Sequence, residues 1–319
     1  YDKAGRVISE TDANKHTTRY RYGKTGLVSE ITDALGQKAL FEYDALGNVT
    51  KITAPGNAVT QYAYDISGRL TTQTDATGLV TEYGYDENSQ LISVVTNGNE
   101  SLYEYDAMGN VSSVTDAEGR CVKLTYDLNG NLAEIIYPDG TKDVTEYDAL
   151  GRVVQSTPRT GLATAYAYDE SGNVVRMTQG EQTTAYEYDL LGRMVRQIAA
   201  DGTETAYAYD ALGNLVGQTD ELGNQTTFSY TAESLLEQVT YANGASQSLS
   251  YDLAGNITGE TDAEGNAKQY QYDKANRLIA VVDELGGKTS YAYDAMDHIV
   301  QVTDALRHAT KYTYDKDGN

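Results

Sequence analysis

Aromatic and polar residues alternate in short runs along this chain, and each run ends near an aspartate followed by a glycine. Residues 61–86, QYAYDISGRLTTQTDATGLVTEYGYD, show the pattern twice, because Tyr-X-Tyr-Asp returns after 21 residues. Alternation with a period of two is typical of a β-strand, whereas Asp and Gly favour turns. The pattern predicts strands of about six or seven residues, joined by tight turns into an antiparallel meander.

The same tyrosine position recurs through the whole sequence. Thirteen of the fifteen intervals between these register tyrosines are 21 residues long and two are 20. Asp follows at fourteen of the sixteen sites, with Gly23 and Thr231 as the exceptions. A fixed period indicates one supersecondary unit repeated along the chain. The register tyrosines are Tyr1, Tyr22, Tyr43, Tyr64, Tyr85, Tyr105, Tyr126, Tyr147, Tyr168, Tyr188, Tyr209, Tyr230, Tyr251, Tyr272, Tyr293 and Tyr314.

The first turn of each repeat follows the register tyrosine, as in residues 43–49, YDALGNV. Asp can open a turn by bonding to its own backbone, and the glycine position suits a left-handed residue that closes a three-residue hairpin loop with a bulge. In that geometry Tyr43 faces Val49 and Asp44 faces Asn48, whereas Ile52 is expected to point away from Tyr43. Twelve of the sixteen glycine positions hold Gly. The other four hold Ser89, Ser234, Asn276 and Asp297.

A second turn is predicted about ten residues further on. It has the form Asp-X-X-Gly at Asp33, Asp75, Asp116, Asp220, Asp262 and Asp283. Tight two-residue turns are predicted instead at Asn97-Gly98, Asp139-Gly140, Asp201-Gly202 and Asn243-Gly244. Both shortened intervals lose their residue at a second turn, near Asn97-Gly98 and Gln179-Gly180.

Two strands per repeat make about thirty strands, so the predicted fold is all-β, with one continuous antiparallel sheet that has to curve, because open sheets rarely exceed about ten strands without curling. Residues 1–319 are predicted to form a single array of about fifteen repeats. The array starts and stops at the same phase, which indicates a fragment of a larger protein. The alternative is a β-propeller, since two repeats match one blade in length. A propeller would require a 42-residue alternation, and none is visible.

Composition excludes several classes of function. The net charge of −23 disfavours nucleic-acid binding, which requires a cationic surface. No apolar run is long enough to span a bilayer. The single cysteine, Cys121, excludes an internal disulfide, and the three histidines, His16, His298 and His308, stand apart in the sequence. No catalytic residue, cofactor site or metal site is therefore predicted. Rows of turn aspartates as a calcium ladder, and rows of tyrosines as a sugar-stacking surface, are less favoured interpretations than a structural role.

The residues with a predicted structural role are the tyrosine, aspartate and glycine positions of the repeat. They are Tyr43, Asp44, Gly47, Tyr64, Asp65, Gly68, Asp75, Gly78, Tyr85, Tyr126, Asp127, Tyr147, Tyr168, Tyr209, Tyr251, Tyr272 and Tyr293.

Residues 64–86 resemble the signature of the RHS or YD-repeat family, Tyr-Asp-X-X-Gly-Arg-Leu followed by Thr-Asp-X-X-Gly and Tyr-X-Tyr-Asp. That family includes bacterial Rhs polymorphic toxins, Tc-toxin shell components, wall-associated proteins and teneurins. The resemblance implies β-hairpins wound in a spiral into a hollow shell, so the curved sheet of this chain is expected to form a partial hollow shell. In the bacterial toxins the shell encloses a C-terminal toxic domain of the same polypeptide. It also implies a secreted or cell-surface protein. The Asp-Pro-rich segment that ends the repeats in those toxins has no counterpart here.

The expected function is thus a non-catalytic segment of shell wall around a passenger toxin or effector. A cell-surface adhesion or carbohydrate-binding module is the alternative. The partners expected are the passenger and other copies of the chain, paired edge to edge through unpaired terminal strands. A sugar is a further possible ligand, and nucleic acid is not expected.

Overall fold

The computed structural model describes residues 1–314, and in this part of the chain the fold is all-β. Thirty strands form one sheet. Hydrogen-bonded neighbours are antiparallel and consecutive in the chain, as in β4 with β5 and β5 with β6. In the described residues, the first strand, β1, pairs with β2 and the last strand, β30, pairs with β29, and the two end strands do not pair with each other. The sheet is therefore not closed. A single continuous sheet rules out the propeller, whose blades are separate four-stranded sheets.

The strands are β1 Ser9–Thr11, β2 Thr17–Tyr22, β3 Val28–Thr32, β4 Lys38–Tyr43, β5 Val49–Thr53, β6 Val59–Tyr64, β7 Leu70–Thr74, β8 Val80–Tyr85, β9 Leu91–Thr96, β10 Asn99–Tyr105, β11 Val111–Thr115, β12 Cys121–Tyr126, β13 Leu132–Ile136, β14 Lys142–Tyr147, β15 Val153–Thr157, β16 Thr164–Tyr168, β17 Val174–Gln179, β18 Gln182–Tyr188, β19 Met194–Ile198, β20 Glu204–Tyr209, β21 Leu215–Thr219, β22 Gln225–Tyr230, β23 Leu236–Thr240, β24 Ser246–Tyr251, β25 Ile257–Thr261, β26 Ala267–Tyr272, β27 Leu278–Val282, β28 Lys288–Tyr293, β29 Ile299–Thr303 and β30 Ala309–Lys311. One short 3₁₀ turn, η1, covers Pro55–Asn57. Residues 1–314 include no helix that could cross a membrane.

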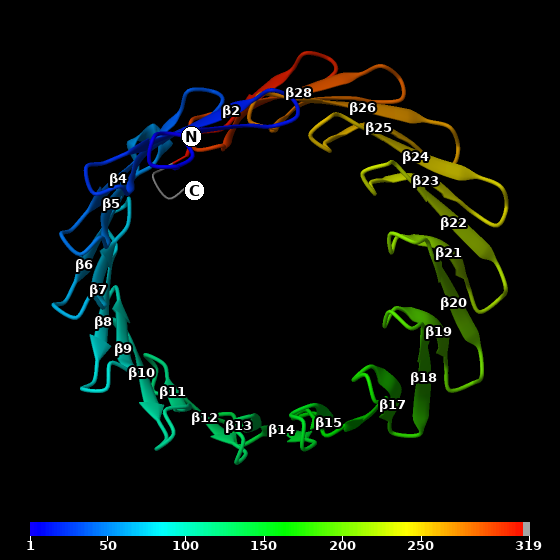
Figure 1. Ribbon diagram of the computed structural model, residues 1–319, viewed down its shortest axis with the longest axis horizontal. Helices are drawn as coiled ribbons and strands as arrows, with labels where there is room; N and C mark the ends of the chain where they lie inside the picture. Colours follow the sequence, from blue (N-terminus) through cyan, green and yellow to red (C-terminus); the bar gives the residue numbers. More distant parts are fainter. Residues whose placement is uncertain (315–319) are drawn as a thin grey trace. The chain divides into compact units, whose positions relative to one another are not determined.

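The chain divides into two compact units. Unit 1 contains Tyr1–Tyr83, Leu235–Gln238 and the residues from Ala245 onward, and unit 2 contains Gly84–Ser234 and Val239–Gly244. The first boundary falls between Tyr83 and Gly84, in the middle of β8, so no linker separates the units there. Within unit 2 the strands follow one another in chain order (Figure 1).

The register of each hairpin includes a bulge that determines which side chains share a face. In the hairpin of β4 and β5, Phe41 lies opposite Ile52, and Tyr43 lies opposite Val49 after a shift in register. The predicted pairing of Tyr43 with Val49 is therefore confirmed. The expectation that Ile52 points away from Tyr43 is wrong. Thr50 is an extra, unpaired residue in β5, so Val49 and Ile52, three positions apart, lie on the same face as Tyr43.

The two faces of the sheet differ, and neither encloses a thick core. Along β4, half-buried side chains at Ala39, Phe41 and Tyr43 alternate with exposed ones. Among the described residues, Ala280 is the one buried hydrophobic side chain, at 1% exposure, and no large side chain is fully buried. Most of the stabilisation therefore comes from cross-strand contacts, backbone hydrogen bonds and the turns.

The first turns have the predicted left-handed residue. Gly47 has a φ of 92°, and Ser89, Ser234, Asn276 and Asp297 have φ between 60° and 67°. Asn and Asp tolerate this region better than other residues with a side chain. The glycine position of the last first turn, Gly318, lies outside the described residues.

Most second turns use the same loop as the first turns. At Asp139-Gly140 the backbone N–H of Tyr137 donates to the carbonyl of Thr141 at 2.9 Å, and that of Gly140 donates to Tyr137 at 2.9 Å. The loop has the same hydrogen bonds as the loop of residues 75–79, which counts five residues when the two closing residues are included. The difference is that Asp stands at the third position here and at the first position in residues 75–79. The prediction of two-residue turns is therefore wrong at Asp139-Gly140, Asp201-Gly202 and Asn243-Gly244, where Gly140, Gly202 and Gly244 close the longer loop.

A two-residue turn does occur at Asn97-Gly98. Both residues have positive φ, 51° and 78°, and Asn99 pairs with Thr96. The other shortened repeat makes a similar turn, in which Gln179 pairs with Gln182. The chain therefore loses residues at its second turns and keeps the strand register.

Candidate functional site

The first candidate group is the turn aspartates, whose carboxylates bond to their own turns. Asp44 Oδ1 accepts the backbone N–H groups of Leu46 and Asn48, each at 2.9 Å. Asp44 Oδ2 accepts Asn48 Nδ2 at 2.9 Å. These hydrogen bonds, above all the one from the Asn48 side chain, lower the pKa of Asp44. Asp127 makes the same bonds with Asn129 and Asn131.

Arginine replaces asparagine at the fifth position of several first turns and connects consecutive repeats. Arg152 Nε donates to Asp148 Oδ2 at 2.7 Å within its own turn. The same guanidinium lies 4.6 Å from the ring centroid of Tyr168, in the next repeat, and donates to the carbonyl of Asp169 at 3.3 Å. Arg193 makes the equivalent contacts with Asp189 and Tyr209. Asp65 also bonds to its turn arginine, Arg69, at 2.7 Å.

The register tyrosines form a ladder of hydroxyl–carbonyl hydrogen bonds across the sheet. Tyr64 Oη donates to the carbonyl of Val49 at 2.9 Å, 15 positions earlier in the chain. Pairing between β5 and β6 ends at Lys51 and Gln61, short of Val49. The tyrosine hydroxyl thus satisfies a carbonyl that the strand pairing leaves open. The same bond is made by Tyr22, Tyr43, Tyr105, Tyr126, Tyr147, Tyr168, Tyr188, Tyr209, Tyr230, Tyr251, Tyr293 and Tyr314.

The remaining residues of the predicted repeat occupy equivalent positions. Tyr85 and Tyr272 end β8 and β26, at the same place as the tyrosines of the ladder. Gly68 and Gly78 have φ of 80° and 95°. Asp75 Oδ1 accepts the backbone N–H of Thr77 at 2.9 Å.

The three histidines stand in for the asparagine or arginine of a turn. His16 Nδ1 lies 3.2 Å from Asp12 Oδ2, and His308 Nδ1 lies 3.0 Å from Asp304 Oδ2. His298 lies 3.2 Å from Asp294 and stacks on Tyr314 with ring centroids 4.7 Å apart. The rings of His298 and His308 therefore hydrogen-bond to the aspartates of their turns, whereas His16 donates its backbone N–H to Asp12 Oδ1 at 2.8 Å.

The described residues contain no group of three or more His, Cys, Asp or Glu side chains placed to hold a metal ion. Cys121, at the start of β12, is free and half-buried. Its Sγ makes a weak contact of 3.9 Å with the carbonyl of Val122.

Tyr137 and Tyr241, which depart from the repeat, belong to second turns. Tyr137 Oη donates to Asp143 Oδ2 at 2.7 Å, and the Arg159 guanidinium lies 4.4 Å from the Tyr137 ring centroid. Asp143 Oδ1 also accepts the backbone N–H of Arg159 at 2.6 Å. These contacts tie two neighbouring second turns together, a structural role.

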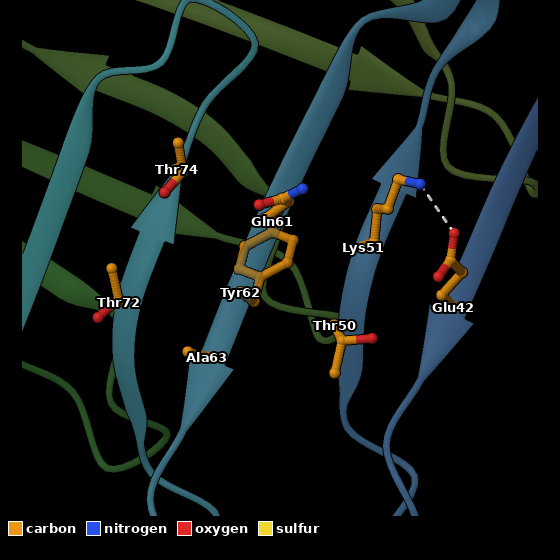
Figure 2. A pocket seen from close by; sticks show the side chains of 8 residues that line it. All are labelled: Glu42, Thr50, Lys51, Gln61, Tyr62, Ala63, Thr72 and Thr74. Carbon is orange, nitrogen blue, oxygen red and sulfur yellow. Dashed lines mark hydrogen bonds and ion pairs between the residues drawn. The ribbon is translucent and has the colours of Figure 1, made fainter.

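One shallow hollow lies on the face opposite the register tyrosines. Figure 2 shows it across β4, β5, β6 and β7, where Lys51 Nζ donates to Glu42 Oε1 at 2.9 Å. Its volume is about 290 Å³, and short side chains, including Ala63 and Thr72, form its floor. A similar hollow of about 340 Å³ lies around Ser250 and Gly259. Both are open, with linings that mix polar and apolar side chains, and they form where the repeat has small residues.

Comparison with known proteins gives a family and a fold. The profile of the RHS repeat matches residues 1–39, 43–78, 67–101, 85–120, 105–142, 147–184, 209–246, 235–269, 251–288 and 272–309. No curated protein matches the chain.

Solved structures of TcdB2-TccC3 have a similar fold. The form without its hypervariable C-terminal region matches with a TM-score of 0.82 and 16% identity, over 99% of this chain and 20% of that one. TcdB2-TccC3 itself matches with a TM-score of 0.81 and 17% identity, over 99% and 21%. TcdB2-TccC3-Cdc42 matches with a TM-score of 0.76 and 18% identity, over 96% and 19%. The chain thus spans about a fifth of the length of these structures.

Proposed function

Because the chain belongs to the RHS repeat family, we propose that it is a segment of the wall of a hollow shell that encloses a C-terminal toxin or effector region of the same polypeptide. The observation that carries the proposal is the match of nearly the whole chain to the fold of TcdB2-TccC3. One of those structures was solved without a hypervariable C-terminal region. A variable region after a constant repeat array is the arrangement that a shell with interchangeable passengers requires.

The proposed mechanism is steric. A sheet whose strands are hydrogen-bonded to both neighbours offers a protease no extended segment to bind. The carboxylates of the turns and the hydroxyls of the register tyrosines form hydrogen bonds within the wall. The carboxylate of Asp127 bonds to its own turn, and the hydroxyl of Tyr126 bonds to the carbonyl of Val111. Such a wall acts without a catalytic residue or a cofactor.

The proposal places the protein outside the producing cell, either secreted or on the cell surface, because a shell of this kind protects its passenger during delivery. The passenger is the partner proposed for the wall. We also propose that residues 1–319 form one repeat array, because the boundary between the two units falls inside β8 and no linker separates them there. This array is proposed to be one part of a longer chain.

Limited proteolysis of the full-length polypeptide tests enclosure. We expect the region after the repeats to resist a protease at concentrations that digest the same region expressed alone. Mild urea that opens the sheet should remove the protection and the β-sheet circular dichroism signal together. Equal rates of cleavage for the attached and the isolated region would contradict enclosure.

The hollows on the face opposite the register tyrosines favour a second candidate, a carbohydrate-binding module. Hydroxyl and amide groups such as Thr50, Gln61 and Thr72 line the hollow in Figure 2, and sugars are bound through such groups. A glycan array probed with the 319-residue chain would support this function if one defined sugar bound and Gln61→Ala removed that binding. Absence of binding to every sugar would leave the shell as the proposed function.

A further inference from the structure

A patch of positive charge lies on one face of the sheet in unit 1, although the whole chain has a net charge of −23. Arg19 and Arg21 are both exposed in β2, and their alternation with Tyr22 places them on the face opposite the register tyrosines. Lys38 begins β4 and is also exposed. Thr32 in β3 lies opposite both Arg19 and Lys38, so the three cations share one face of the sheet.

Two carboxylates on this face neutralise only part of the patch. Glu30 in β3 lies 3.1 Å from Lys38 Nζ and 3.6 Å from the Arg21 guanidinium. Glu42 in β4 accepts a hydrogen bond from Lys51 Nζ at 2.9 Å. Four positive and two negative charges leave this face of β2 to β5 with a net charge of +2. The four cations are Arg19, Arg21, Lys38 and Lys51.

The charged groups of the patch are accessible to a ligand. Arg21 is 72% exposed and Lys38 is 52% exposed, so both remain in contact with solvent beside Glu30. Arg19 has no ion-pair partner among residues 1–314. Strand pairing extends a sheet at its edge strands, and the patch lies on the face of strands that are already paired on both sides. Further repeats paired at an edge of the sheet would therefore leave the patch uncovered.

The patch borders the hollow of Figure 2, and Lys51 belongs to both. Gln61 lies opposite Lys51 in the strand pairing, and Thr72 and Thr74 follow on β7. A ligand that runs across the strands from β2 to β7 would meet cations first and neutral hydrogen-bonding groups afterwards. The cationic part, from β2 to β5, covers three strand spacings, or about 14 Å.

The second hollow, around Ser250 and Gly259, has no such patch beside it. The positions of this face in β24 to β27 hold Ser, Gly, Thr, Ala, Gln and Val. Its lining also includes one carboxylate and one ammonium group, Glu260 and Lys268, which lie opposite each other and balance in charge. Positive charge therefore distinguishes the first hollow from the second.

We propose that the patch and its hollow bind an acidic oligosaccharide, with the carboxylates of the sugar on Arg19, Arg21 and Lys38 and its hydroxyl groups in the hollow. The inference rests on the carbohydrate-binding candidate and adds the class of sugar. A guanidinium matches both oxygens of a carboxylate, and hydroxyl and amide groups bond to sugar hydroxyls. At physiological ionic strength, charges more than about 8 Å away are largely screened, so the distant turn aspartates repel the ligand only weakly.

Calorimetric titration of the 319-residue chain with an oligogalacturonate tests the proposal. Methyl esterification of the same oligosaccharide removes its negative charges and keeps its rings, so we expect the ester to bind about tenfold more weakly or worse. The double substitution Arg19→Gln and Arg21→Gln should weaken binding of the acidic form by a similar factor. Arg176→Gln is the matched control, because Arg176 is an exposed arginine on the same face of β17 in unit 2, and it should change nothing. Circular dichroism checks that each variant is folded.

Equal binding of the acidic form and its ester would overturn the acidic class and leave a module for neutral sugars. A double variant that binds as well as the wild type would overturn the site. Equally tight binding of a DNA oligonucleotide would overturn the sugar, because it would show a general affinity for polyanions. Absence of binding by both forms would also overturn the inference, and the glycan array would then decide separately whether the carbohydrate-binding candidate fails.

Discussion

The hydroxyl of Tyr64 donates a hydrogen bond to the carbonyl of Val49, which lies on the neighbouring hairpin. Val49 itself faces Tyr43, the register tyrosine of its own repeat. Each tyrosine therefore links its hairpin to the previous one near the first turns, where strand pairing between hairpins has ended. The ladder holds together a sheet in which no large side chain of the described residues is fully buried.

Removal of one hydroxyl should weaken the ladder locally. Tyr209 Oη donates to the carbonyl of Met194 at 2.9 Å, so Tyr209→Phe leaves that carbonyl without its partner. We expect a loss of about 1 kcal/mol in the free energy of unfolding, measured by urea denaturation. Tyr207→Phe, two positions earlier in β20, is the control and should cost little. Equal effects of the two substitutions would contradict the role of the ladder.

Substitutions at two left-handed turn positions are expected to change the stability of the fold in opposite directions. Gly213 has a φ of 95°, and an added Cβ would meet nothing within 4 Å, so the cost of Gly213→Ala is purely conformational, about 1 kcal/mol. Gly213→Asn should cost less, because Asn tolerates this region better. Arg307 has a φ of 68° without being glycine, so Arg307→Gly should stabilise the fold by up to about 1 kcal/mol. Thermal denaturation of the three variants gives the order, and a stabilising Gly213→Ala would contradict it.

The repeat made most of the fold predictable, because turn residues at a fixed spacing determine where each strand starts and ends. Two features were beyond the pattern of side chains. The turn residues predict the bulge at Gly47, but the second bulge, at Thr50 within the strand, has no residue signature of its own, so Ile52 was assigned to the wrong face. The acceptor of each tyrosine hydroxyl is a backbone carbonyl, which any residue type supplies. The spacing of 15 residues, shortened to 14 for Tyr105 and Tyr188, becomes interpretable only once the register is known.

Within unit 1, the contact of the second turn at Asp12 and Asn14 with the first turns at Asp252 and Asn276 was also beyond prediction. Asn14 and Asp252 stand 238 positions apart, and the repeat places an equivalent turn residue in every unit. Which turns meet depends on the accumulated twist and bend of many strands, and local sequence does not specify that sum.

Acid should destabilise the sheet through its turns. Hydrogen bonds from Arg69, first from its backbone and then from its side chain, lower the pKa of Asp65 below the ordinary value of 3.8. A carboxylate with a lowered pKa stabilises the folded state above pH 3.8, and the contribution disappears as the pH falls through the folded-state pKa. The melting temperature should therefore drop between about pH 4 and pH 2.

A triple variant with Asp65, Asp127 and Asp148 changed to Asn should melt lower at neutral pH and show a shallower acid dependence. Protonation also reduces the negative charge of the chain, which acts in the opposite direction. High salt screens that charge effect and should leave the dependence of the turns in place. Identical acid profiles of the variant and the wild type in high salt would contradict the role of these carboxylates.

Alkali should affect a different pair. Tyr270 Oη donates to Glu260 Oε2 at 2.8 Å, and this bond, followed by burial, raises the pKa of Tyr270 from 10.0 to about 12. Because the protonated hydroxyl is the stabilising form, its contribution is complete below pH 10.0 and is lost as the pH rises toward 12.

Carbon NMR of chains labelled in the tyrosine rings, assigned with Tyr270→Phe, measures the titration of this one hydroxyl. Glu260→Gln should return the pKa toward 10.0, because the acceptor loses its negative charge. Tyr20, which donates to Glu10 at 2.9 Å, should retain its raised pKa in that variant. A wild-type Tyr270 that titrates near 10.0 would show that the pair does not form in solution.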